Sequence, residues 1–551
     1  MNVLVLDIET NLAHDKIWCC AYHCSWFFPS TIHVETSESI AGLKSAIKGA
    51  DVIVGHNIIG FDGPILSKVW GVKIPIRKVR DTLVMSRLLN PQLEGGHSLR
   101  AWGERIGEYK DDFTDFDGGL SHEMVTYCKQ DVTVTAELYR RLDRDLKDFG
   151  RSVGLEHQVA VLMKRQENNG FKLNVPEAVS LLAELKDRMS VITDEMQAIF
   201  PPIVEERWSE KTGKQLKDKV TVFNVGSRQQ IAERLHSLGA KFTKKTEKGS
   251  IIVDESVLAG IDLPEAQVIA EYLMLQKRVG LIDSWLEHVD INTFRVHGRV
   301  ITNGAVTGRM THSNPNMGQI PSVSSIYGAE CRKLWTVDAG NVLVGCDLSG
   351  IELRCLAHYM QDDEWTKELL DGDIHTKNQK AAGLETRAQA KTFIYATLYG
   401  AGPAKIGSIV GGGAAAGSRL LQSFYSNTPR LAALMQKVQR LAEKGYVPGL
   451  DGRQIQVRSQ HSALNSLLQG CGAIIAKQWC VEMHRRFREQ GIDVQQVAFV
   501  HDEIQVETKE DDGQRVADIM VESAKQAGIT LGFRCPVDAE AKIGYNWFDT
   551  H

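Results

Sequence analysis

Two acidic residues near the N-terminus follow an apolar run and could bind a metal ion together. The run VLVL predicts a buried strand that ends in Asp7, and Glu9 follows two positions later. Side chains two positions apart on a strand point to the same face, so both carboxylates can reach one ion. Further acids follow at Asp62, in NIIGFD, and at Asp131, in YCKQD. An isolated D-x-E pair has little specificity, but four carboxylates from three segments could hold two divalent ions for phosphodiester hydrolysis.

A second group of acids lies in the C-terminal half, again where predicted strands end. NVLVGCD is an apolar run that ends in Asp347, and about 155 residues later VAFV leads into His501, Asp502 and Glu503. The alternating segment IQVE that follows indicates a hairpin with acids at its turn. On its own, HDE could be an ordinary exposed turn. Two strand-end carboxylates that meet across a sheet would form a two-metal centre for in-line displacement on a nucleoside triphosphate.

A segment between these strands carries cations and an aromatic ring at helical spacing. Arg387, Lys391 and Tyr395 recur every four residues in RAQAKTFIYATLYG, so a helix would place them on one face. Two cations could bind a triphosphate, and the ring could stack beside a sugar and base. A solvated basic stripe is the usual alternative for such spacing. The aromatic residue and the terminal Tyr399 and Gly400 favour nucleotide binding.

The elements that must position these residues change in character along the chain. Short apolar strands alternate with helices up to about residue 145, which predicts an α/β domain. From about 155 to 290 the apolar spacing is mostly helical, and after 295 strands, glycine-bearing turns and helices are mixed. The run GGGAAAG at 411–417 predicts a flexible surface connection. Asp81, in RDTLVMSRLL, is expected to have a surface or capping role, with assistance to the first acid group as the alternative.

The composition is that of an ordinary globular protein with several domains. The 551 residues exceed what one hydrophobic core supports, and 43% of them are hydrophobic and 24% charged. No stretch approaches the ~20 apolar residues of a membrane span, and the first residues do not resemble a signal peptide. The ten cysteines lack metal-binding spacing and are expected to be reduced and mostly buried.

The charge distribution leaves room for a nucleic-acid partner. The net charge of −5 argues weakly against one, but an average conceals separate acidic centres and basic tracks. Residues 201–250 contain 11 Lys or Arg against 6 Asp or Glu. This stretch could contact a phosphate backbone, and a solvated surface loop is an equally good interpretation.

Several segments resemble the signature motifs of a known enzyme family. DLSGIELR, RAQAKTFIYATLYGAG and HDE look like motifs A, B and C of family A DNA polymerases, the DNA polymerase I family. NGAVTGRMTHSNPNMGQIP, GDIHTKNQ and LDGRQIQVRS resemble the T-seven-like phage branch of that family, and the likeness covers nearly the whole chain. The ordered series DIET, HNxxxFD and YxxxD resembles the three motifs of DEDD-type 3′→5′ exonucleases.

The resemblance implies both a fold and an activity. The implied fold is multidomain, α+β and α/β: a right-hand polymerase of palm, fingers and thumb with an N-terminal RNase H-like 3′→5′ exonuclease domain. The implied boundaries are 1–150 for the exonuclease domain, 151–295 for the thumb, 296–360 for the first part of the palm, 361–460 for the fingers and 461–551 for the second part of the palm. The implied activity is template-directed DNA synthesis from dNTPs at a primer 3′ end, with exonucleolytic proofreading.

The resemblance also implies which residues hold metal ions. In the exonuclease centre the implied set is Asp7, Glu9, Asp62 and Asp131 as ligands, with Tyr127 positioning the attacking water. In the polymerase centre it is Asp347, Asp502 and the Leu348 carbonyl as ligands, with Glu503 as a neighbouring acid counted among the catalytic residues. Each centre is expected to use two Mg²⁺ ions, for which Mn²⁺ can substitute.

Nucleotide and DNA contacts follow from the same resemblance. The implied nucleotide-binding residues are Arg387, Lys391, Tyr395, His375, Glu352 and Tyr399. Lys391 would act as general acid toward pyrophosphate, and Glu352 with Tyr399 would disfavour a 2′-hydroxyl. Arg309, Gln469 and His501 would read minor-groove acceptors, which are similar in every correct base pair.

The expected partners are primer-template DNA and dNTPs, without a membrane. A phage helicase-primase and a single-strand-binding protein are further candidates, in the cytoplasm of an infected bacterial host, and a monomer is assumed. The related phage enzyme recruits host thioredoxin through a long thumb insertion. Here only a short basic segment, 201–222, occupies that position, so no dependence on thioredoxin is expected.

Three alternatives remain open on the sequence. A single-subunit RNA polymerase shares the palm chemistry, although Glu352 and the exonuclease motifs argue against it. An exonuclease whose polymerase half only binds DNA is a second alternative. The third is a replisome scaffold with both centres inactive, which would require the loss of at least one metal ligand.

Overall fold

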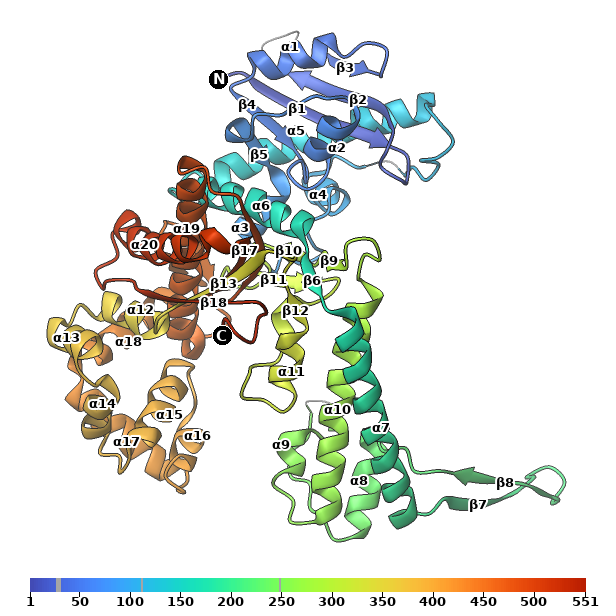
Figure 1. The fold of residues 1–551 in the computed structure, drawn as a ribbon, viewed down its shortest axis with the longest axis vertical. Helices are drawn as coiled ribbons and strands as arrows, with labels where there is room; N and C mark the ends of the chain where they lie inside the picture. The colour runs from blue at the N-terminus through green and yellow to red at the C-terminus, as the bar shows by residue number, and fades with distance from the viewer. Residues whose placement is uncertain (26–30, 111, 247–248) are drawn as a thin grey trace.

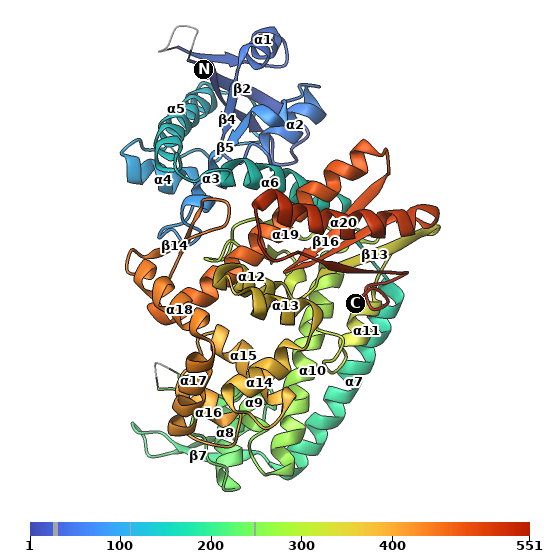
Figure 2. The ribbon, with the colours of Figure 1, turned by 90° about the vertical axis from the view of Figure 1, so that its left-hand side faces the viewer.

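A computed structural model describes residues 1–25, 31–110, 112–246 and 249–551 of the chain. Glu247 and Lys248 of the basic stretch 201–250 therefore lie outside the described residues. The N-terminal part lies at one end of the molecule, and two helical lobes extend from a central sheet toward the other end (Figure 1 and Figure 2). Among the described residues, no helix is long and apolar enough to cross a membrane. All ten cysteines are described, buried and free of disulfides, as expected.

The N-terminal part is built on a five-stranded mixed sheet in the order β3-β2-β1-β4-β5. The acid-bearing strand β1 lies at its centre, antiparallel to β2 and parallel to β4. The strands are β1 (Val3–Thr10), β2 (Ile17–Cys24), β3 (Ile32–Glu35), β4 (Val52–Gly55) and β5 (Val79–Asp81). The helices are α1 (Ala41–Gly49), α2 (Asp62–Val69), α3 (Thr82–Leu89), α4 (Leu99–Ile106) and α5 (His122–Asp145).

The two faces of this sheet have separate cores. Leu4, Leu6 and Ile8 pack with apolar residues of α1 and α2, whereas Val5 packs with residues of α5. Asp7 and Glu9 alternate in phase with Val5, so strand geometry directs them toward α5. The pleat of β1 therefore decides which helix completes the acid cluster.

A long helical lobe follows the N-terminal part. α6 (Ser152–Asn169) leads from the N-terminal sheet to the centre of the molecule (Figure 1). The lobe itself comprises α7 (Val175–Ile199), α8 (Arg228–Ser237), α9 (Glu255–Leu258) and α10 (Pro264–Glu287). From its far end a hairpin of β7 (Ile203–Trp208) and β8 (Gln215–Thr221) projects away from the lobe, and every residue of β7 is exposed.

The central sheet is antiparallel, in the order β16-β17-β13-β18. Its strands are β13 (Asn341–Leu348), β16 (Val494–Val500), β17 (Glu503–Lys509) and β18 (Ala539–Gly544). The helices α19 (Ala463–Glu489) and α20 (Gly513–Leu531) share a core with Val342, Val344 and Cys346 of β13. Asp347 is out of phase with these residues and so projects from the opposite face, away from the two helices.

The second helical lobe includes the glycine-rich run. Its helices are α12 (Ile351–Met360), α13 (Asp363–Asp371), α14 (Ile374–Ala382), α15 (Arg387–Leu398), α16 (Pro403–Ser408), α17 (Ala414–Asn427) and α18 (Pro429–Ala442). The surface connection predicted at 411–417 is wrong for its second half, because residues 414–417 begin α17. A Cβ at Gly417 would lie 1.8 Å from the Pro403 carbonyl oxygen, so the glycine permits the close approach of α17 to α16.

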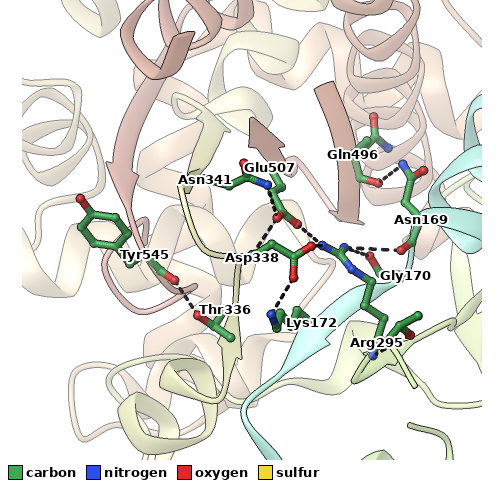
Figure 3. A network of polar contacts seen from close by, with 11 residues as sticks. Asn169, Gly170, Lys172, Arg295, Thr336, Asp338, Asn341, Gln496, Glu507 and Tyr545 are labelled. Atoms are coloured by element: carbon green, nitrogen blue, oxygen red, sulfur yellow. Dashed lines mark hydrogen bonds and ion pairs between the residues drawn. The ribbon is translucent and has the colours of Figure 1, made fainter. Parts of the chain in front are cut away.

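A partly buried ionic network joins the base of the first lobe to the central sheet (Figure 3). The base is a small sheet of β6 (Phe171–Leu173), β9 (Arg295–Val296) and β12 (Trp335–Thr336). Arg295 Nη2 donates to Asp338 at 2.6 Å and to Glu507 of β17 at 2.7 Å. Lys172 Nζ also donates to Asp338, at 2.6 Å. The buried charges of Arg295 and Glu507 need each other as partners, so their ion pair fixes the small sheet against β17.

Shorter elements complete the fold. They are β10 (Arg299–Ile301), β11 (Thr311–Ser313), α11 (Gly328–Lys333), β14 (Tyr446–Pro448) and β15 (Gln454–Gln456). β10 pairs with β11 and precedes the turn that carries Arg309.

Candidate active sites

The first predicted acid group forms one pocket. A cavity of about 300 Å³ is lined by all four predicted carboxylates and by Tyr127. β1 supplies Asp7 and Glu9, the first residue of α2 supplies Asp62, and α5 supplies Tyr127 and Asp131. Asp131 follows Tyr127 by one helical turn, so both residues lie on one side of α5. The structure therefore brings together every residue predicted for this centre.

The carboxylates of this pocket have too little positive charge around them, which fits a cation-binding role. Burial, and then the charge of Asp131, raises the pKa of Glu9 to about 8. Burial also raises the pKa of Asp62 to about 7, and burial with three neighbouring carboxylates raises that of Asp7. Glu9 Oε1 is buried without a hydrogen-bond partner among the described residues. Carboxylate oxygens suit Mg²⁺ or Mn²⁺, so the residues present fit the divalent ions that the resemblance implies.

Two members of this pocket were not predicted from the sequence. Lys110 forms an ion pair with Asp131, and its ammonium lies 4.4 Å from the centre of the Tyr127 ring. Cys128 Sγ lies 3.8 Å from Asp7 Oδ2, and one ligand atom each from Asp7, Glu9 and Cys128 fall within 4.8 Å of one another. Cys128 directly follows Tyr127 in the sequence, so its position next to a predicted site residue could have indicated that it lies in the pocket. Lys110 comes from a loop and no spacing indicated it.

Asp81 has the capping role expected from the sequence, together with a second one. Its carboxylate caps α3 by accepting from the Leu83 and Val84 N–H groups at 2.9 and 3.4 Å. It also accepts from the N–H groups of Asn57 and Ile59, both at 3.0 Å. These two residues belong to the loop that precedes Asp62.

The second predicted acid group forms where β13 ends and its neighbour β17 begins. In the pairing of β13 with β17, Asp347 lies opposite Glu503. The Leu348 N–H donates to the Asp502 carbonyl at 3.1 Å, which holds the β16–β17 turn against the end of β13. His501, in that turn, has the left-handed φ of 59°. The hairpin and the meeting of the acids across the sheet agree with the sequence prediction.

The three acids differ in their electrostatic environment. Asp347 keeps an exposed face, but partial desolvation, followed by the charges of Asp502 and Glu503, raises its pKa to about 7. Burial raises the pKa of Asp502, although the nearby Arg309 cation acts to lower it. Glu503 behaves differently, because burial is outweighed by hydrogen bonds and positive charge and its pKa is lowered. The raised pKa values of Asp347 and Asp502 show that nearby cations do not fully compensate their negative charge. Such a pair of carboxylates is suited to bind divalent ions.

Helix α15 presents the predicted basic and aromatic face. Arg387 and Lys391 are exposed and Tyr395 is half-buried on this helix. The start of α15 is fixed by a capping box between Thr386 and Gln389. Arg387 Nε donates to Asp373 Oδ2 at 2.7 Å, which leaves both terminal nitrogens available to a ligand. The sequence did not predict this role of Asp373, although the residue lies in the segment GDIHTKNQ that carries part of the family resemblance.

An acid–tyrosine pair links this helix to the acidic centre. Tyr399 Oη donates to the carboxylate of Glu352 at 2.8 and 2.9 Å. Arg309 Nη2 lies 3.5 Å from Glu352 Oε1. The rings of Tyr395 and Tyr399 are 6.4 Å apart and roughly parallel, at 29°. Burial, and then the charges of Glu352 and Asp502, raises the pKa of Tyr395, so the aromatic face adjoins the acids.

The remaining predicted residues lie around this centre. The His375 ring is 6.5 Å from that of Tyr395, and its Nδ1 is buried without a hydrogen-bond partner among the described residues. Gln469 is half-buried on α19, and His501 is exposed at the β16–β17 turn. No hydrogen bond of the Gln469 or His501 side chain is found within the described part of the chain, so both are available to a ligand.

Comparisons with known proteins agree with this geometry. A family profile described as "DNA polymerase family A" matches residues 204–549. The DNA-directed DNA polymerases of Enterobacteria phage T3 and Escherichia phage T7 are each 34% identical over 100% of both chains. The alignment with the T3 protein spans 707 positions against 551 residues here, so that relative has segments that this chain lacks. DNA polymerase I of Aquifex aeolicus is 28% identical over 90% of this chain and 88% of its own.

A solved structure shares the whole fold. The polymerase domain of Pol1 from M. smegmatis, in complex with DNA primer-template and dNTP, superposes with a TM-score of 0.83. The match covers 100% of this chain and 96% of that one at 18% identity.

Proposed function

The chain belongs to DNA polymerase family A and is a DNA-directed DNA polymerase, and we propose that it uses the two acidic centres for DNA synthesis and for 3′→5′ removal of nucleotides. The observation that carries the synthetic assignment is that the turn with Asp502 is held against the end of β13, next to Asp347, and that Tyr395 of α15 lies near Asp502. The observation that carries the exonuclease assignment is the single pocket lined by four carboxylates and Tyr127.

In the polymerase centre, the chain's own residues bind and orient the reactants. Arg387, Lys391 and His375 would bind the triphosphate, and Lys391 would donate a proton to the leaving pyrophosphate. Glu352, fixed by Tyr399, would occupy the space that a 2′-hydroxyl requires. The side chains of Arg309, Gln469 and His501 would donate to minor-groove acceptors at the primer end.

In the exonuclease centre, α5 would hold the attacking water through Tyr127. The Lys110 ammonium lies over the Tyr127 ring and beside Asp131, so it would help to orient both. Asp7, Glu9, Asp62 and Asp131 would hold divalent ions here, as Asp347, Asp502 and the Leu348 carbonyl would in the polymerase centre. When bound, such ions lower the pKa of the attacking hydroxyl or water and stabilise the leaving oxygen.

The role of Glu503 within this proposal is structural rather than catalytic. It accepts hydrogen bonds from Trp547 and from Gln505 Nε2, the latter at 2.6 Å. His551 Nδ1 lies 3.3 Å from its other oxygen. A carboxylate held on these sides is poorly placed to bind an ion, so we assign it to anchoring residues 547–551 beside the centre.

The domain division implied by the resemblance remains part of the proposal. The first lobe, α7 to α10, falls within 151–295, and α13 to α18 fall within 361–460. β13 falls within 296–360, and the other three strands of the central sheet fall within 461–551. Thumb, fingers and a palm in two parts are therefore consistent with the observed elements, with 1–150 as the exonuclease domain.

Primer-template DNA and dNTPs are the proposed ligands, as in the M. smegmatis complex. The phage relatives support an infected bacterial host as the proposed setting, with helicase-primase and single-strand-binding protein as candidate partners. The family and the names of the whole-length relatives favour DNA synthesis over an RNA polymerase or a replisome scaffold.

Two single variants test the assignment on one primed template with Mg²⁺. Asp347→Asn should abolish primer extension and leave degradation of single-stranded DNA intact. Asp7→Ala should abolish degradation and leave extension intact. If either change abolished both activities, the assignment of two separate centres would be wrong.

A further inference from the structure

The loop that delivers Asp62 to the exonuclease pocket is held by one buried carboxylate. The loop leaves β4 and passes through Asn57, whose φ of 65° is unusual for a residue with a side chain. The N–H groups of Asn57 and Ile59 both donate to the carboxylate of Asp81, a residue that is 1% exposed. A buried carboxylate that accepts four backbone N–H groups fixes their positions relative to one another. The position of Asp62 thus depends on that of Asp81.

Asp81 is in turn held by a residue of α6, beyond the predicted exonuclease domain. The Asp81 N–H donates to His157 Nε2 at 2.7 Å, and His157 Nδ1 lies 2.7 Å from the Val153 carbonyl oxygen. A carbonyl only accepts, so the ring proton must be on Nδ1, and Nε2 is left as the acceptor for Asp81. Burial lowers the pKa of His157 to about 4, which keeps this neutral form at neutral pH.

Cavities lie on both sides of this contact, while Ile58 and Ile59 of the loop are buried in the core of the N-terminal part. Asn57, Ile59 and Asp81 line a cavity of about 340 Å³ together with residues of α6 and β10. His157 lines a second cavity, of about 720 Å³, between the N-terminal part and α19. Apolar packing of these isoleucines and the hydrogen bonds of Asp81 together hold the loop. His157 is bonded to Asp81 from the side of α6.

The helix that carries His157 is anchored to the polymerase half by the preceding residue. Glu156 is 0% exposed and accepts from Lys477 Nζ of α19 at 2.7 Å. Arg453 Nη2 lies 2.7 Å from the same oxygen of Glu156. Two consecutive residues of α6 therefore have partners on different sides. Glu156 binds the polymerase half, and His157 binds Asp81, which holds the loop after β4.

We propose that His157 is a positioning residue for the exonuclease centre: from α6 it holds Asp81, and through Asp81 the loop that carries Asp62. The polymerase half thus supplies part of the support of the hydrolytic site. This inference rests on the proposed exonuclease function, and it assigns no contact between His157 and DNA.

Three variants of the full chain test it. His157→Leu removes the acceptor, whereas His157→Gln places an amide oxygen near the position of Nε2. The matched control is His484→Leu, because His484 is a half-buried histidine whose pKa is also lowered to about 4 by desolvation, but it contacts Gln496 instead. Degradation of a single-stranded oligonucleotide, primer extension and the melting temperature are measured for each.

We expect His157→Leu to lower kcat for degradation roughly 10–100-fold, as for other residues that orient a metal ligand, with little change in KM or in extension. His157→Gln should recover most of the activity, and His484→Leu should leave it unchanged. Equal losses for the Leu and Gln variants, or a parallel fall in extension, would overturn the proposal, as would unchanged degradation by His157→Leu.

Hydrogen–deuterium exchange separates this inference from the proposed function. In His157→Leu the peptide containing residues 55–62 should exchange faster than in the unmodified chain, and in His157→Gln it should not. If the unmodified chain degraded no DNA, the exonuclease assignment would fail, while the exchange result would still decide whether His157 holds the loop. Unchanged exchange in His157→Leu would overturn the positioning role.

Discussion

Asp347 and Glu503 lie opposite each other on β13 and β17, yet their carboxyl pKa values shift in opposite directions. Partial desolvation and like charge raise that of Asp347 to about 7. Glu503 is more deeply buried, but His551, Arg332 and the Trp547 and Gln505 donors lower its pKa. The two acids, paired on neighbouring strands, therefore lie in opposite electrostatic environments, which supports the different roles proposed for them.

This difference predicts opposite outcomes for two substitutions. Asp502→Asn should reduce primer extension on the order of 10³-fold or more, without lowering the melting temperature, because it removes like-charge repulsion. Glu503→Gln should lower stability by about 1–3 kcal/mol, the range for hydrogen bonds to a charged group, and retain measurable extension. Steady-state extension and thermal melts of both variants check this. Complete loss of extension in a folded Glu503→Gln variant would contradict it.

The contact between Glu352 and Tyr399 predicts how the enzyme excludes ribonucleotides. Glu352→Ala should raise the kcat/KM for NTPs relative to dNTPs by about tenfold or more, because it opens space beside the sugar. Tyr399→Phe keeps the ring and removes only the hydroxyl donor, so it should have a smaller effect. Single-nucleotide incorporation with paired dNTP and NTP substrates measures the ratio. An unchanged ratio in Glu352→Ala would exclude a gating role for this residue.

The raised pKa values in the pocket of Asp7, Glu9, Asp62 and Asp131 predict a metal-dependent pH profile of stability. Glu9 has a folded pKa of about 8 against an ordinary value of 4.5. Between these values the folded state binds more protons than the unfolded state, so stability falls as pH rises through this window. Mg²⁺ binds the deprotonated carboxylates and should restore stability at pH 8, increasingly with its concentration.

Differential scanning fluorimetry in EDTA and in Mg²⁺, from pH 5 to 8.5, checks this expectation. The double variant Asp7→Asn/Glu9→Gln is the control, and its profile should be flatter and less sensitive to Mg²⁺. The expectation fails if the metal-free melting temperature is constant in the unmodified chain, or if the control responds equally.

The buried pair of Glu156 and Lys477 predicts strong coupling between α6 and α19. Lys477→Met should cost about 3 kcal/mol, because removal of one partner leaves a buried carboxylate with less compensation. The double variant Glu156→Gln/Lys477→Met should cost less than the sum of the two single variants. Urea unfolding of the four proteins gives the coupling energy. Additivity within about 0.5 kcal/mol would show that the pair is not coupled.

The exposed hairpin β7–β8 predicts that its loss is tolerated. An isolated two-stranded hairpin has little stability of its own, and all of β7 is exposed. Replacement of residues 203–221 by a short glycine-serine linker should leave the melting temperature unchanged. If its lysines contact DNA, the salt dependence of primer-template binding should weaken, whereas an unchanged slope would favour a solvated surface. A lower melting temperature would contradict this expectation, because it would mean that the hairpin packs against the rest of the protein.

The same short segment predicts independence from thioredoxin. Primer extension on a long template should give the same product lengths with and without added host thioredoxin. A large gain in product length would contradict this expectation and would make segment 201–222 the first region to examine.

Local sequence pattern was sufficient wherever one element fixes the geometry. The two-residue spacing of Asp7 and Glu9 placed both on one face of a strand, since the strand period is two. The four-residue spacing of Arg387, Lys391 and Tyr395 placed them on one helical face for the corresponding reason. The family resemblance then identified Asp62 and Asp131 as members of the first cluster, which spacing alone did not require.

Contacts between distant segments were decided by the tertiary structure. The sequence grouped Glu503 with Asp347 and Asp502, but the folding of Trp547 and His551 against it gives its carboxylate other partners. The run at 411–417 has the composition of a loop, yet packing against α16 makes its second half helical. Lys110 and His157 carry no local signal of their roles. A side chain's function at such places depends on which charges and cavities the fold brings beside it, and no spacing within one segment specifies them.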